Sequence, residues 1–92
     1  MSSEEEIYHG INMVLYVPRE AVLDIARPGR NDEAVGHWVG RVDWTGVSHD
    51  SVAAELREAG MEPDSYDEDQ ARRYLLWIAC HNLADEGGND DR

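Results

Sequence analysis

Carboxylates are the side chains of this sequence whose density could support chemistry. Five of them lie within eight residues, with no arginine among them: Glu62, Asp64, Asp67, Glu68 and Asp69. Such a cluster could bind a cation or present negative charge to a basic surface. A calcium loop of the EF-hand type needs a glycine at its sixth position and a glutamate at its twelfth. Counted from Asp64, those positions hold Asp69 and Leu75, so an EF-hand is excluded.

The histidines and the single cysteine form no catalytic or metal-ligating pattern. The four histidines share no ligand spacing such as H-x-x-x-H. Cys80 ends an apolar run that begins at Tyr74, which is typical of a buried, unreactive thiol. The sequence has no G-x-S-x-G motif and no glycine-rich phosphate loop. We therefore expect a protein that is not an enzyme and that has no catalytic residues, no cofactor and no dedicated metal site.

Net charge is the outlying property of the composition. Twenty Asp and Glu face eight basic residues, all arginine, for a net charge of −12. Residues 1–46 carry a net −4 and residues 47–92 a net −8, so the acid concentrates in the second half. Such a surface repels nucleic acid and anionic membranes and attracts basic partners. We expect a basic protein partner, and no direct binding to nucleic acid or membrane.

The acidic cluster is the predicted partner-binding site, with Asp85 and Glu86 as further contributors. In size, acidity and lack of catalytic motifs, the chain resembles phage anti-CRISPR and anti-restriction proteins and the immunity proteins of nuclease toxins. The resemblance covers overall character and not a motif. It implies a DNA mimic, a binding inhibitor that blocks a nucleic-acid-handling defence protein or nuclease by occupying its basic surface.

Two other classes of function fit the same composition. An interaction or adaptor protein, or a homodimer, could dock through an apolar patch built from Trp38, Trp44, Trp77, Met13 and Met61. Tryptophan is enriched at interface hot spots, although in a small domain it is more often part of the core. A generic acidic domain from a halophile is the other class, and it predicts unfolding at low salt.

Ninety-two residues are enough for one small domain, predicted as residues 1–86 with a flexible acidic tail at 87–92. The N-terminus is acidic where a signal peptide would be basic. The longest apolar run is seven residues, against about 20 needed to cross a bilayer. We expect a cytoplasmic protein, located in the host cytoplasm if a phage encodes it.

The element that must position the acidic cluster is a long helix predicted over residues 65–86. Ser65 and Glu68 have the spacing of a capping box, and Gly87 with Gly88 would end the helix. Two apolar stripes make this helix apolar on most sides, which is typical of a helix wrapped by its own domain. The first comprises Ala71, Tyr74, Leu75 and Ile78, with Asn82 at the same helical spacing, and the second comprises Leu76, Ala79 and Leu83.

The fold class predicted is mainly α, a bundle of about five short helices around this C-terminal helix. Ser48 would cap a helix that ends at Gly60, with Met61 folding back. Capping-box and helical spacing favour a helix within residues 2–17, but alternation of apolar residues there also suits a strand. The alternative is an α+β fold with short strands near 11–17 and 36–44.

Overall fold

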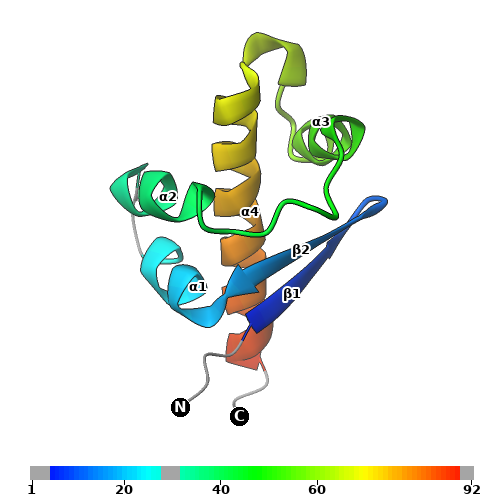
Figure 1. Ribbon diagram of the computed structural model, residues 1–92. Helices are drawn as coiled ribbons and strands as arrows, with labels where there is room; N and C mark the ends of the chain where they lie inside the picture. Colours follow the sequence, from blue (N-terminus) through cyan, green and yellow to red (C-terminus); the bar gives the residue numbers. More distant parts are fainter. Residues whose placement is uncertain (1–4, 28–31, 90–92) are drawn as a thin grey trace.

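The computed structural model describes residues 5–27 and 32–89, with side chains described as far as Asp85. This part of the chain forms an antiparallel hairpin, four α-helices and one 3₁₀ turn (Figure 1): β1 (Glu5–Gly10), β2 (Met13–Pro18), α1 (Arg19–Ile25), α2 (Asp32–Val39), α3 (His49–Glu58), η1 (Pro63–Ser65) and α4 (Glu68–Asn89). The fold is therefore α+β. It is close to the predicted alternative: β2 corresponds to the strand expected near 11–17, whereas residues 36–44 hold the end of α2 and a single bridge, and β1 was not predicted. The predicted bundle of about five helices is wrong in its first element.

Helix α4 is the centre of the fold, as predicted. Figure 1 shows it running through the molecule, and α1, α2, α3 and β1 all contact it. Leu75, Leu76, Ala79 and Cys80 are fully buried on it. Both predicted apolar stripes thus contribute to the core, although Ile78 is only partly buried. The core closes over Leu75 and Leu76 more completely than over Ile78.

The predicted ends of the central helix are both wrong. Ser65 lies in η1, and α4 starts at Glu68. Asp67 is its N-cap, because a side-chain oxygen of Asp67 accepts a hydrogen bond from the Gln70 N–H at 2.8 Å. Pro63 begins the 3₁₀ turn, and Ser65 is part of that turn. The next residue able to cap a helix is therefore Asp67. At the other end the helix reaches Asn89 and passes through both glycines, while residues 90–92 of the predicted tail lie outside the described residues.

The predicted N-terminal helix is a β-hairpin instead. Met13, Leu15 and Val17 are buried while Val14 and Tyr16 are not, so the alternating pattern governs the segment. The two strands pair in register from Glu5 opposite Pro18 to Gly10 opposite Met13. Asn12 adopts a left-handed conformation in the turn, with φ 56°, which Asn tolerates better than most residues.

The middle of the chain follows the helical prediction. Helix α2 occupies Asp32–Val39, and the alternative strand at 36–44 is reduced to one bridge between Asp43 and Tyr16. Ser48 caps α3, because its hydroxyl oxygen accepts a hydrogen bond from the Ser51 N–H at 3.1 Å. At its other end Gly60 has φ +84°, and the Met61 N–H reaches the Leu56 carbonyl at 2.9 Å. That is the predicted Schellman-type C-terminus.

Candidate functional site

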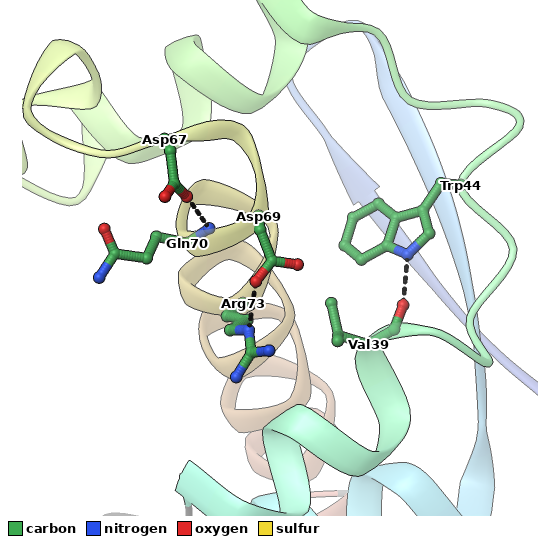
Figure 2. A network of polar contacts seen from close by, with 6 residues as sticks. All are labelled: Val39, Trp44, Asp67, Asp69, Gln70 and Arg73. Carbon is green, nitrogen blue, oxygen red and sulfur yellow. Dashed lines mark hydrogen bonds and ion pairs between the residues drawn. The ribbon is translucent and has the colours of Figure 1, made fainter.

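Three of the five clustered carboxylates are engaged at the start of α4, as Figure 2 shows for two of them. Asp67 caps the helix, as described above. Glu68 pairs with Arg72 at 3.3 Å and Asp69 with Arg73 at 2.9 Å, each one helical turn further on. Exposed pairs of this kind contribute about 0.2–0.5 kcal/mol each. They hold the side chains in place but are weak enough for a stronger cationic partner to displace them.

The other two carboxylates of the cluster are more open. Glu62 and Asp64 are exposed and make no ion pair or hydrogen bond through their side chains within the described part of the chain. The two arginines of the first turns offset part of the charge, so residues 62–73 carry a net −3. The carboxylates of the predicted site without an ion-pair partner in the described part of the chain, Glu62 and Asp64, therefore lie on the segment that leads into α4.

A groove of about 580 Å³ adjoins this acidic segment. Val35, Met61, Tyr74 and Trp77 supply its apolar and aromatic surface. Trp77 keeps 38% of its surface exposed, which is high for the largest side chain of a small domain. The polar residues that complete the lining are Asp32, Asp69, Gln70 and Arg73. The groove thus joins one residue of the acidic cluster, Asp69, to two residues of the predicted apolar patch, Met61 and Trp77.

Asp85 does not belong to the same patch. It is exposed, but it lies 17 residues after Glu68 on the same helix, which is about 26 Å along the axis. The residues between positions 69 and 85 contain no acid and two arginines. The side chain of Glu86 lies outside the described residues. The predicted site is therefore one acidic segment at residues 62–69 and a separate carboxylate near the far end of α4.

The predicted apolar patch is also divided. Met13 is buried in the core. Trp38 and Trp44 are partly buried, and each indole N–H has an internal acceptor: Trp38 donates to Asp24 at 3.0 Å and Trp44 to the Val39 carbonyl at 2.7 Å (Figure 2). Their rings serve the packing of the domain, and Trp77 is the most exposed of the three tryptophans.

Glu55 is the polar residue that the sequence analysis missed. It is buried on α3, where one oxygen accepts a hydrogen bond from the Tyr8 hydroxyl at 2.7 Å and the other from the Ile11 N–H at 2.5 Å. Its position between Val52 and Leu56 on the apolar face of α3 was a usable signal. Since both oxygens are satisfied inside the fold, Glu55 supports the hairpin and is closed to a ligand.

Cys80 matches its predicted environment. The thiol is buried in the core, and desolvation raises its pKa to about 12. A thiol that stays protonated at neutral pH is a poor nucleophile and a poor metal ligand. In residues 5–27 and 32–89, no three His, Cys, Asp or Glu side chains are grouped so that they could hold a metal ion.

Comparison with known proteins leaves the site to be judged on its geometry. No family model matches the chain, and no curated protein or solved structure matches it. Of the helices in the described part of the chain, none combines the length and the apolar character that a membrane-spanning segment requires.

Proposed function

We propose that the protein is a small non-enzymatic binding inhibitor of the DNA-mimic type. Its acidic segment, residues 62–69, occupies the basic nucleic-acid-binding surface of a nucleic-acid-handling defence protein or nuclease. The observation that carries the proposal is the exposure of Glu62 and Asp64 beside a groove that holds an exposed tryptophan. Charge attracts a basic surface over a distance, and an aromatic anchor in a groove supplies short-range affinity.

The fold favours such docking because the acidic segment is held at both ends. The Schellman-type turn at Gly60 precedes it, and its last residues, Asp67 to Asp69, form the capped N-terminus of α4. Tyr66 also packs against Tyr74 in a tilted arrangement, with ring centroids 4.8 Å apart. A segment ordered before binding loses less conformational entropy when it docks, which favours affinity. The carboxylates are therefore carried on a positioned segment.

The experiment is affinity capture with the tagged protein from a lysate of its source or host. Identification of the retained proteins by mass would follow. Binding of the captured partner is then measured as salt rises. We expect affinity to fall steeply with salt, and the partner's binding to DNA or RNA to be lost in the complex. A partner that binds the protein and nucleic acid at once would exclude the proposal. The protein alone should give no gel shift with duplex or single-stranded DNA at low salt, since its net charge is −12.

A second function is favoured by Trp77 itself. An adaptor that docks mainly through the groove would use Trp77, Met61 and Tyr74 as its contact surface. Its affinity would depend little on salt, because burial of apolar surface is not screened by ions. The salt titration therefore separates the two functions. A domain whose acidity only reflects a salt-rich environment would instead unfold at low salt.

A further inference from the structure

Strand β1 pairs with β2 on one side only, as far as the described part of the chain shows. The outer side of β2 is occupied, because Tyr16 bridges Asp43 and the Val14 N–H reaches the Gly46 carbonyl at 3.4 Å. On the other side of the hairpin, no strand pairs with β1 within residues 5–27 and 32–89. An open edge of this kind is a template for another strand, and proteins commonly protect such edges.

The register of the hairpin identifies the main-chain groups that face outward. The two-residue turn makes Gly10 and Met13 the first hydrogen-bonded pair, and such pairs alternate along an antiparallel ladder. The main-chain N–H and C=O groups of residues 6, 8 and 10 therefore point toward β2. The outward groups of β1 belong to Glu5, Ile7 and His9. The outer contacts of β2 agree, since Tyr16 and Val14 stand opposite Ile7 and His9 and also direct their groups outward.

The side chains of these three residues are exposed and self-complementary. Ile7 is 45% exposed at the middle of the strand, with an acid two residues before it and a histidine two residues after it. An antiparallel copy centred on Ile7 would place Ile7 opposite Ile7 and Glu5 opposite His9. An imidazole N–H facing a carboxylate is a favourable cross-strand pair, and the symmetric arrangement forms it twice.

We propose that β1 pairs with β1 of a second copy of this chain to form a continuous four-stranded antiparallel sheet. The pairing centred on Ile7 keeps the same pleat in both copies, so both cores lie on the same face of the joined sheet. This interface is distinct from the acidic segment at residues 62–69. The dimer would leave the groove and that segment free, so it goes beyond the proposed inhibition.

The dimer should be weak and should strengthen as salt rises. One short strand per protomer is a small interface, of the size found in transient complexes. Each protomer carries a net −12, so two copies repel one another at low ionic strength. Salt screens this repulsion over about 8 Å at 0.15 M. Self-association should therefore respond to salt in the direction opposite to binding of a basic partner.

The test is sedimentation velocity of the full chain over a wide concentration range, at 0.15 M and 0.5 M salt. We expect a monomer–dimer equilibrium that shifts toward dimer at the higher salt. Ile7→Lys should abolish the dimer, whereas Leu23→Lys, which alters a side chain 64% exposed on α1, should not. His9→Glu places a glutamate opposite Glu5 at two positions and should weaken dimerisation about tenfold. Glu5→Arg combined with His9→Glu should restore it.

Circular dichroism confirms that each variant is folded. Wild-type protein that stays monomeric at every concentration and salt would overturn the proposal. A dimer that survives both Ile7→Lys and His9→Glu would also overturn it, because another surface would then be responsible. An edge strand that binds a different protein and never a second copy counts against it as well.

Discussion

The carboxylate of Glu55 and the hydroxyl of Tyr8 are 2.7 Å apart, although 47 residues separate them in the sequence. The second oxygen of Glu55 holds the Ile11 N–H, and Ser51, one turn earlier on α3, donates to the Asn12 carbonyl at 3.1 Å. One face of α3 thus fixes both a strand and the turn of the hairpin. Gly10 is required beside it, since a Cβ there would lie 2.5 Å from a Glu55 oxygen.

Replacing Glu55 should therefore loosen the hairpin. Glu55→Ala should lower the free energy of unfolding by about 2–4 kcal/mol, because it leaves two donors without their charged acceptor. Tyr8→Phe should cost about 1–2 kcal/mol. Urea unfolding of the two single variants and the double variant measures their coupling, which should be about 1 kcal/mol. Glu58→Ala, on the exposed side of the same helix, is the control and should be nearly silent. Strictly additive effects would show that the two residues act independently.

This long-range contact explains why the hairpin was hard to predict. Ile7, Ile11, Val14 and Leu15 have helical spacing, and nothing near them in the sequence reveals acceptors on α3. Ser48 and Gly60 could be predicted because a cap depends on neighbours within a few residues. The central helix could be predicted because its apolar stripes are long. Its start moved to Glu68, with Asp67 as the cap, because a 3₁₀ turn at Pro63 competed for the same residues.

The candidate site was predictable in composition but not in shape. The density of acid between Glu62 and Asp69 is visible in the sequence, whereas the groove beside it requires α2 to pack against α4. The distance from this segment to Asp85 follows only once α4 is known to be continuous between them. The sequence also does not reveal that Trp38 and Trp44 are held inside the fold, because their hydrogen-bond acceptors, Asp24 and the Val39 carbonyl, are known only from the structure.

The packing of α4 predicts unequal costs for two neighbouring truncations. Leu75→Ala should lower the free energy of unfolding by about 2–5 kcal/mol, because Leu75 is fully buried and its removal leaves a cavity. Ile78→Ala should cost about 1–2 kcal/mol, since Ile78 only partly contacts the core. Urea denaturation of both variants, with equal m-values, gives the comparison. Equal losses would mean that the core extends beyond Ile78.

Cys80 should be protected from thiol reagents in the folded protein. At pH 8 we expect slow labelling by a disulfide reagent in buffer and fast labelling in urea, because burial keeps the thiol inaccessible and protonated. Burial raises the pKa to about 12 from an ordinary value of 9.0, so between these values the unfolded chain loses a proton that the folded chain retains. Stability should therefore fall as pH rises from 9 toward 12.

Cys80→Ala isolates that contribution from the other groups that titrate at high pH. As pH rises from 9 toward 12, the free energy of unfolding of wild type should fall relative to that of Cys80→Ala. A difference that stays constant with pH would mean that Cys80 has a similar pKa in both states. Rapid labelling at pH 8 in the absence of urea would show that the core around α4 opens readily.

Charge reversal at the acidic segment provides the decisive test of the proposed function. Glu62→Arg with Asp64→Arg should weaken binding of the captured partner by about a hundredfold or more, because two exposed carboxylates become repulsive toward a basic surface. These positions are preferred to Asp67, whose reversal would also remove the cap of α4. Glu20→Arg with Asp50→Arg is the matched control, since it changes the net charge equally at exposed positions on α1 and α3.

The control variant should slow association modestly, because overall charge steers encounter, and should leave dissociation unchanged. Trp77→Ala, by contrast, should speed dissociation if the groove supplies the anchor. Surface plasmon resonance separates the two rates, and circular dichroism checks folding. Equal losses in the two charge variants would assign the effect to net charge alone. A folded Glu62→Arg/Asp64→Arg variant that binds as tightly as wild type would reduce the acidic segment to a solvated surface and leave Trp77 as the remaining contact.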